Sequence, residues 1–229
     1  MARLSIIMPV LDEGDGIAGA LDPLAELRGL GVEVIVVDGG SHDATVQRAR
    51  LRADHVLLAP CGRALQMNAG AAKASGDVLL FLHADTRLPP EAERLVLDGL
   101  ARSTRHWGRF DVTIEGRHPM LPVIAFTMNL RSRMTGIATG DQAIFVKRDA
   151  FQTAGGFAEI PLMEDVALSK RLKRTGRPLC LRERAITSGR RWETHGVFRT
   201  ILLMWRLRLA YFFGADPAAL ARRYRYGGG

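Results

Sequence analysis

The sequence predicts an α/β protein with a mainly parallel sheet, helices on both of its faces and a helical C-terminal extension. In its first half, short and continuous apolar runs alternate with segments that have helical spacing. Such apolar runs are typical of strands buried on both faces, and their alternation with helices implies parallel crossover connections. The 229 residues are 47% hydrophobic and 24% charged, as in a globular protein. We therefore expect one domain over residues 1–229 and exclude disordered, collagenous and disulfide-scaffold proteins.

The expected elements follow one another in a regular order. Buried strands are predicted over 4–10, 32–38, 55–60 and 77–85. Helices are predicted over 15–29, 43–52, 62–75 and 90–102. Residues 110–115 alternate like a half-exposed strand that pairs antiparallel at an edge, and 143–148 predict a further strand. A helix is expected over 163–175, and the C-terminal extension over 190–229.

The charge is unevenly distributed. Residues 1–115 hold 12 Lys and Arg against 16 Asp and Glu, whereas residues 116–229 hold 20 against 8. Most of the basic residues are arginines, which suit phosphate or anionic lipid, although a solvated basic face is the plainer interpretation. Aromatic residues are only 7% and do not interleave with a basic run, so a nucleic-acid partner is not expected.

No targeting or membrane-spanning segment is predicted. The apolar run 4–11 is too short for a signal peptide and leads directly into Asp12 and Glu13. The longest apolar stretch, 201–213, is interrupted by two arginines and is shorter than the roughly 20 residues that span a bilayer. Cys61 and Cys180 have no CxxC partner and predict buried thiols of a cytoplasmic protein rather than a zinc or redox site.

Acidic residues collect where the predicted strands end. Strand 4–10 is followed by Asp12 and Glu13, strand 32–38 ends at Asp38, and strand 77–85 ends at His83 and Asp85. In open parallel sheets the ligand lies beyond these carboxyl ends, so the acids predict a crevice for a divalent cation or for nucleoside hydroxyls and amides. The sequence lacks GxxxxGK[ST] and a GxGxxG after the first strand, which excludes a P-loop NTPase and disfavours a Rossmann dehydrogenase.

Six segments together resemble a known enzyme family. They are SIIMPVLDE (5–13), VIVVDGGSHDAT (34–45), VLLFLHADT (78–86), GGF (155–157), MED (163–165) and RRW (190–192). Their order and spacing resemble the family 2 glycosyltransferases over nearly the whole chain. The resemblance implies the GT-A fold, a Rossmann-like α/β arrangement. Segments 62–77 and 161–174 are most similar to a small bacterial branch associated with radical-SAM and selenoprotein-type domains.

The resemblance implies roles for residues around the nucleotide. Asp38 matches the acid that contacts the nucleoside base, and Pro9 and Glu13 match the loop beneath that base. Arg63 matches a basic residue near the nucleotide. The donor implied is a nucleotide-diphosphate sugar, with UDP favoured over GDP.

It also implies a metal site. Asp85 matches the last acid of the D-x-D element, which ligates the Mg²⁺ or Mn²⁺ that bridges the donor diphosphate. The first D-x-D position is His83, which could hydrogen-bond the ribose but leaves one carboxylate fewer for the metal. His195 is a candidate late ligand, with a purely structural role as the alternative.

The remaining candidates concern the transfer itself. Asp165 matches the acid of the ED pair that acts as base, with Glu164 beside it, and first-turn helix acids are the plainer interpretation. Arg190, Arg191 and Trp192 match the R-W end of a longer motif and could contact the diphosphate. Gly140, Asp141 and Gln142 either line the acceptor pocket or form a simple turn. The implied reaction is an inverting transfer to a hydroxyl acceptor.

Two further interpretations stay open at this point. A nucleotidyltransferase shares the layout of strands and acids, and a degenerate nucleotide-binding or membrane-adaptor protein would be consistent with His83. The helix predicted over 196–213 is apolar nearly all round. We expect this helix to pack on its own domain or across a homodimer. The alternative is peripheral contact with the inner face of the membrane, which would supply a lipid or lipid-linked acceptor. The Met and aromatic residues within 126–134 are expected to be core.

Overall fold

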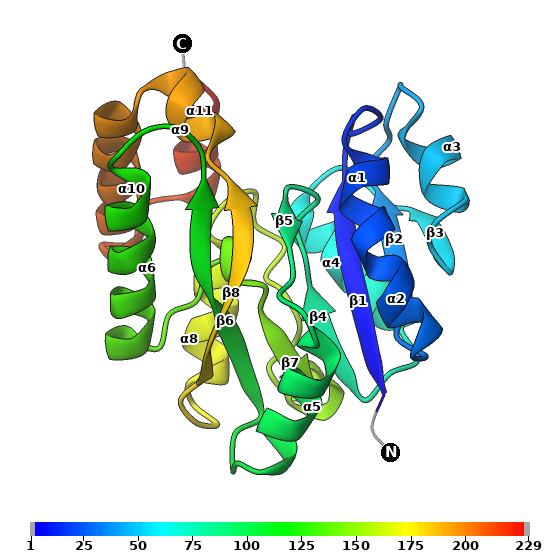
Figure 1. Ribbon diagram of the computed structural model, residues 1–229. Helices are drawn as coiled ribbons and strands as arrows, with labels where there is room; N and C mark the ends of the chain where they lie inside the picture. The colour runs from blue at the N-terminus through cyan, green and yellow to red at the C-terminus, as the bar shows by residue number, and fades with distance from the viewer. Residues whose placement is uncertain (1–2, 227–229) are drawn as a thin grey trace.

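The computed structural model describes residues 3–226, which form an eight-stranded sheet with helices on both faces (Figure 1). The strand order is β3-β2-β1-β4-β7-β6-β8-β5. The strands are β1 (Leu4–Val10), β2 (Glu33–Asp38), β3 (His55–Leu58), β4 (Val78–Phe81), β5 (Thr86–Arg87), β6 (Trp107–Glu115), β7 (Phe145–Lys147) and β8 (Leu179–Ser188). The helices of the first half are α1 (Ile17–Leu21), η1 (Asp22–Leu24), α2 (Ala25–Gly29), α3 (Thr45–Arg50), α4 (Arg63–Lys73) and α5 (Ala92–Ala101). Those of the second half are α6 (Leu121–Thr135), η2 (Gly140–Gln142), α7 (Arg148–Thr153), α8 (Glu164–Leu172), α9 (Arg190–His195), α10 (Val197–Phe212) and α11 (Pro217–Tyr226).

The N-terminal half of the sheet is parallel, as predicted. Strand β1 pairs with β2 on one side and β4 on the other, and β3 extends the sheet beyond β2, all in parallel register. Every residue of β1 is buried, which explains why its sequence is continuously apolar. The carboxyl ends of β1, β2 and β4 therefore meet at one edge of the sheet.

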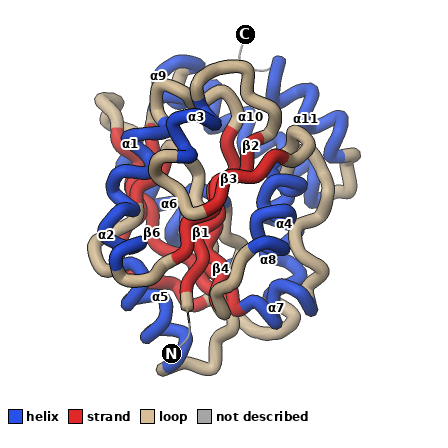
Figure 2. Tube along the Cα trace, turned by 90° about the vertical axis from the view of Figure 1, so that its right-hand side faces the viewer, coloured by secondary structure: helices blue, strands red, loops and turns tan. Residues whose placement is uncertain are grey.

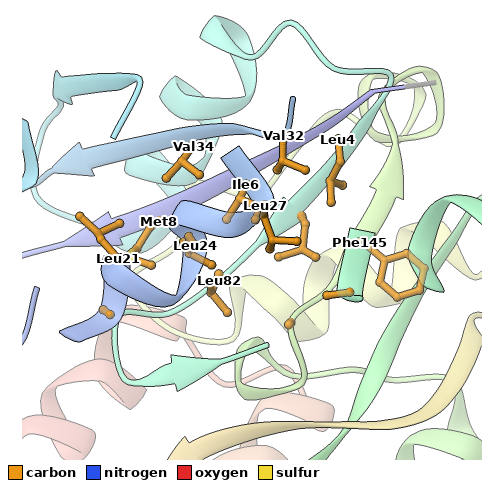
Figure 3. Packing of buried hydrophobic residues seen from close by; sticks show 14 of the residues in the cluster. Leu4, Ile6, Met8, Leu21, Leu24, Leu27, Val32, Val34, Leu82 and Phe145 are labelled. Atoms are coloured by element: carbon orange, nitrogen blue, oxygen red, sulfur yellow. The ribbon is translucent and has the colours of Figure 1, made fainter. Parts of the chain in front are cut away.

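Alternate side chains of these strands supply two separate cores. Ile6 and Met8 of β1 pack under α1, α2 and α5 together with Val34 and Leu82 (Figure 3). Ile7 faces the other way, toward α4, α7 and α8. The helices thus cover both faces, as the views in Figures 1 and 2 show.

The C-terminal half of the sheet is mixed. Strand β7 pairs antiparallel with both β4 and β6, while β6 and β8 are parallel and β5 lies antiparallel at the edge. The strand predicted at 110–115 exists as part of β6 and has the expected alternating burial. Its expected antiparallel pairing at an edge is wrong, because residues 110–115 pair in parallel with β8, while Trp107 and Gly108 make the antiparallel pairs with β7. Strand β8 escaped prediction because exposed residues 182–184 interrupt its apolar pattern, beside a shift in register between Phe110 and Asp111.

Helix α6 packs against β6 through one face and leaves another exposed. Its buried residues include Ile124 and Met128, which contact Val112 and Ile114. Phe126 and Met134 are 65% and 67% exposed. The prediction that 126–134 is core is therefore wrong for these side chains, because apolar residues occur on both faces of this helix.

The C-terminal extension is helical, as predicted, but α10 does not bury its broad apolar face. Leu207 is anchored beside Met163, Val166 and Leu220, whereas Trp205 is 73% exposed. The expectation that this face packs on its own domain is thus wrong. In the described part of the chain, no helix has the length and apolarity required to cross a bilayer.

The two cysteines are not both buried thiols. Cys61 is exposed on the loop before α4, and Cys180 is partly buried in β8; both are unpaired. The expectation from the sequence was therefore wrong, because Cys61 lies where the chain leaves the sheet rather than inside a strand.

Candidate active site

A two-lobed cleft opens at the carboxyl ends of the strands. The first lobe has a volume of about 330 Å³ and lies over the ends of β1 and β4, where it includes Pro9, Gly62 and Gln66. The second lobe, of about 570 Å³, extends to α8, α9 and α10. The residues that line both lobes are Glu13, Arg63, His83, Asp85, Leu162 and Tyr224. Those that line the second lobe alone include Gly140, Asp141, Glu164, Asp165, Arg190, Arg191, Trp192 and His195. The structure thus brings together all the predicted site residues except Asp38 and Gln142.

Asp38 and Gln142 are buried behind the cleft and hold neighbouring segments through hydrogen bonds. Asp38 is 1% exposed and accepts hydrogen bonds at 2.8 Å from the backbone N–H groups of Gly40 and Ser41. The hydroxyl of Ser41 also donates to it. Gln142 is fully buried and donates through Nε2 to Asn129 Oδ1 at 3.3 Å. Their carboxylate and amide groups are engaged in holding loops, so neither lines the cleft.

Gln66 ties the ends of the two central strands together. Its Nε2 donates to the carbonyls of Val10 and Val37, both at 2.8 Å, from a fully buried position on α4. Val10 is the last residue of β1 and Val37 the next to last of β2, so one side chain joins the ends of the two strands. The Val10 carbonyl also accepts from the backbone N–H of Gly39 at 2.9 Å. The sequence offered no signal for this role beyond a polar residue on the apolar face of a predicted helix.

Glu13, Asp85 and Arg190 form a charged group between the lobes. Burial raises the pKa of Glu13, the charge of Arg190 opposes that shift, and the charges of Asp85 and Asp43 reinforce it. Asp85 itself is exposed at the mouth, and its carboxylate is within 3.3 Å of the Thr86 hydroxyl. A cation or a phosphate bound by arginine would therefore meet carboxylate charge on one side and guanidinium charge on the other.

His83 and Gly140 are packed against each other. A Cβ added at Gly140 would lie 2.2 Å from His83 Cε1, so only glycine fits there. His83 Nδ1 lies 3.6 Å from Asp141 Oδ1. Although burial opposes the shift, His83 and the charges of Arg63 and Arg131 hold the pKa of Asp141 below its ordinary value. The histidine in the D-x-D position thus lies beside an acid of the same lobe.

The acid pair lies at the start of α8. Its preceding residue, Met163, is buried with a left-handed φ of 70°, a conformation that costs a non-glycine residue on the order of 1 kcal/mol. Asp165 accepts from the backbone N–H groups of Gly140 at 3.0 Å and Val166 at 2.7 Å. Glu164 is only 6% exposed. Burial raises the pKa of both carboxyls, and the charge of Asp165 adds to the shift at Glu164.

Arg131 is a further charged residue behind this pair that the sequence did not single out. Its Nε and Nη2 are buried and find no hydrogen-bond partner among the described residues. Burial lowers the pKa of Arg131, while the charges of Asp165 and Asp141 support its ionised form.

Helix α9 carries the predicted basic pair to the second lobe. The Arg191 guanidinium lies 3.7 Å above the centroid of the Tyr224 ring, and its Nη2 donates to the Tyr224 carbonyl at 3.5 Å. Trp192 packs beside the α6 core, while Arg190 is exposed. Tyr224, on α11, was not predicted from the sequence because nothing in its neighbourhood matches a functional motif.

A cation could find only part of its ligands in the protein. Within residues 3–226 no cluster of three His, Cys, Asp or Glu side chains is arranged to hold a metal ion. Asp85 and His195 line the same lobe without forming such a cluster. Mg²⁺ and Mn²⁺ accept oxygen ligands from substrates and water as well, so the donor set fits a metal shared with a bound diphosphate.

Comparison with known proteins identifies the matching family. The model of glycosyl transferase family 2 matches residues 5–153. An uncharacterized glycosyltransferase of Escherichia coli (strain K12), YibD, is 30% identical over 94 residues, which are 38% of this chain and 27% of that protein. The chain thus spans about a quarter of the length of this curated relative.

Solved structures share the fold. Staphylococcus aureus TarS (residues 1–349, with UDP-GlcNAc) superposes with a TM-score of 0.66 at 18% identity, over 81% of this chain and 58% of that one. The mannosyltransferase PcManGT of Pyrobaculum calidifontis, with GDP-Man and Mn²⁺, has the same TM-score at 17% identity, over 99% and 70% of the two chains. Glucosyl-3-phosphoglycerate synthase of Mycobacterium tuberculosis, in complex with Mn²⁺, UDP and glucosyl-3-phosphoglycerate, has a TM-score of 0.57 at 19% identity, over 81% of this chain and 71% of that one. At these identities the likeness confirms the predicted GT-A fold.

Proposed function

Because the chain belongs to the family 2 glycosyltransferases, we propose that it moves a sugar from a nucleotide-diphosphate sugar to a hydroxyl acceptor with inversion at the anomeric carbon. The observation that carries this proposal is the placement of the Glu164–Asp165 acid pair in the same lobe as Asp85 and Arg190. A base for the acceptor and counter-charges for the leaving group thus lie in one cleft.

The donor would occupy both lobes. Pro9 and Gln66 line the first lobe, which suits the nucleoside, and Arg63 stands where the lobes join. Arg190 would contact the diphosphate, since a guanidinium can form two parallel hydrogen bonds with phosphate oxygens. We further propose that UDP is the preferred nucleotide and that the chain belongs to the radical-SAM-associated branch. Asp38 would act on the base indirectly, through the loop that its carboxylate holds.

Asp85 and His195 are the donors that the chain offers to Mg²⁺ or Mn²⁺. A bound divalent ion would supply stabilisation of the negative charge that develops on the departing diphosphate. Two of the structural neighbours are complexes that contain Mn²⁺. Arg190 and Arg63 would provide positive charge at the same place, from the protein itself.

Asp165 is proposed as the base. It would take the proton of the acceptor hydroxyl as that oxygen bonds to the anomeric carbon, while the bond from this carbon to the diphosphate breaks and the electron pair leaves with the diphosphate. Hydrogen bonds from Gly140 and Val166 fix its carboxylate. A raised pKa increases the basicity of the ionised carboxylate, which favours proton transfer near neutral pH. Glu164 would hold the position of Arg63 through its charge.

Asp165→Asn tests the assignment. We expect kcat to fall by about 10²- to 10⁴-fold while the affinity for the donor changes little, because a base acts mainly in the transition state. Turnover and donor binding are measured with UDP-, GDP- and dTDP-sugars, with lipid extract as acceptor, and Glu164→Gln is the matched comparison. If Glu164→Gln shows the loss of kcat instead, the two roles are exchanged. Release of pyrophosphate rather than nucleoside diphosphate would point to a nucleotidyltransferase, and binding without turnover to a degenerate protein.

A further inference from the structure

Helix α10 exposes an apolar stripe that no part of residues 3–226 covers. Phe198, Leu202, Trp205, Leu209 and Phe212 are between 59% and 73% exposed, and they recur at intervals of three or four residues. Such spacing places them on one face of the helix. Contiguous exposed apolar surface of this kind marks an interaction site.

Helix α6 extends this surface. The two helices lie side by side along the left edge of the molecule in Figure 1 and share a small core that includes Val197 and Ile124. The ring centroids of His118 and Phe198 are 6.4 Å apart at the beginning of the two helices. Phe126, Leu130 and Met134 of α6 are 45% to 67% exposed. We call these residues, together with the α10 stripe, the outer face.

The two helices of the outer face carry charge of a single sign. Residues 116–140 and 194–215 contain no Asp or Glu, and α10 carries Arg199, Arg206 and Arg208. A second copy packed symmetrically on this face would bring the exposed Arg206 of each copy toward the other, and neither α6 nor α10 carries an acid to pair with it, which is unfavourable. An anionic bilayer surface has the complementary charge and also accepts aromatic and aliphatic side chains at its interface.

We propose that the outer face is a docking surface for a membrane that contains anionic lipids. Helix α10 lies in the plane of the interface, with Trp205 and Phe212 at the level of the headgroups and acyl chains and Arg206 beside lipid phosphates. This agrees with the absence of a bilayer-spanning helix from the described part of the chain.

The same helix connects this surface to the cleft. Thr200, Met204 and Arg208 of α10 line the second lobe. At 100° per residue, the cleft-lining side of α10 and the exposed apolar stripe centred on Trp205 point about 120° apart. A docked protein would therefore present its second lobe beside the bilayer, so that a lipid or lipid-linked hydroxyl could enter it. That last step rests on the proposed glycosyl transfer, whereas docking itself does not.

Flotation with lipid vesicles tests the docking. Wild-type protein is mixed with vesicles of phosphatidylglycerol and phosphatidylcholine in equal parts, or with phosphatidylcholine alone, at low and high salt. We expect it to float with the mixed vesicles at low salt and to lose this binding at high salt or without phosphatidylglycerol. Trp205→Ser combined with Phe212→Ser should weaken partitioning on the order of 100-fold, since two aromatic side chains no longer leave water. Arg206→Gln should weaken it about fivefold.

Matched controls lie at the other end of the sheet. Leu51→Ser with Leu58→Ser removes two apolar side chains of 79% and 73% exposure, and Arg50→Gln removes one exposed arginine of α3. Both controls should float like wild type. Wild type that stays unbound on both kinds of vesicle, or outer-face variants that float as well as the controls, would overturn the proposal. If light scattering shows that wild type is a dimer and that the Trp205 and Phe212 double variant is a monomer, the outer face binds a second copy instead. Donor binding measured on the same samples reports on the proposed function independently, since none of these variants lines the cleft.

Discussion

Asp165 illustrates how neighbouring charges set the properties of one residue. Its carboxylate is held by two backbone N–H groups, which favour the ionised form, yet burial and the charge of Asp141 together raise its pKa. A base must be ionised to accept a proton, so the acid limb of the pH profile reports on this residue if the assignment is correct. The same burial destabilises the protein. Because the pKa of Asp165 is higher in the folded than in the unfolded state, the free energy of unfolding falls as the pH rises from the unfolded-state pKa through the folded-state pKa.

Asp141→Asn should therefore move the acid limb of kcat to lower pH. The substitution removes a negative charge that disfavours ionised Asp165, so the pKa of Asp165 falls and the base is ionised at more acidic pH. The measurement is kcat against pH under saturating donor. Asp149→Asn, the same change at an exposed site outside both lobes, should leave the limb in place. A limb that moves to higher pH, or not at all, would contradict the role assigned to these two acids.

At the scale of elements, the position of α4 depends on one glycine. A Cβ at Gly70 would lie 2.4 Å from Cγ2 of Ile7 and 3.0 Å from Cγ2 of Val37, so the helix backbone rests directly on β1 and β2. This close approach sets the height of Gln66 and Arg63 over the strand ends, because all three residues belong to the same helix.

Gly70→Ala should destabilise the protein by about 1–3 kcal/mol, since a methyl group has no room between helix and sheet. Gly19→Ala is the matched control, because a Cβ at Gly19 in α1 meets nothing within 4 Å. There the higher helix propensity of alanine should stabilise by about 0.5–1 kcal/mol. Urea unfolding of both variants and of wild type gives the change in the free energy of unfolding for each substitution. The interpretation fails if the two changes have the same sign.

What the sequence could predict follows from how strongly each element is patterned. Strands such as β1 and helices such as α4 were predicted because their apolar residues follow the pattern of their burial: a continuous run in β1 and one face in α4. Strand β8 and helix α6 were not, since their burial is decided by partners distant in the chain. Glu13 and Asp85 could be placed in one cleft from topology alone, whereas Asp38, also at a strand end, is buried behind it. Gln66 and Tyr224 act through contacts that only the fold creates.

At the scale of the whole molecule, the cleft is closed by the two ends of the chain acting together. Arg63 and Glu13 come from the first half of the chain. Helix α11 is held over them by the packing of Leu220 beside Met163, and α9 by the packing of Trp192 beside α6. The contact between Arg191 and Tyr224 is the most direct link between these two C-terminal helices. This contact lies where the two lobes meet, because Tyr224 lines both of them.

Tyr224→Ala should therefore weaken donor binding more than it weakens the fold. Loss of the ring removes a cation–π contact worth about 0.5–2 kcal/mol and frees Arg191 to move out of the cleft, so the dissociation constant of the donor should rise by a few-fold to about 30-fold. Tyr224→Phe keeps a ring beneath the guanidinium and should bind the donor almost like wild type. Calorimetric titration of a nucleotide-diphosphate sugar into the three proteins makes the comparison, with thermal unfolding run in parallel. Equal weakening by Ala and Phe would show that the phenolic hydroxyl, rather than the ring stacked on Arg191, is what the donor site requires.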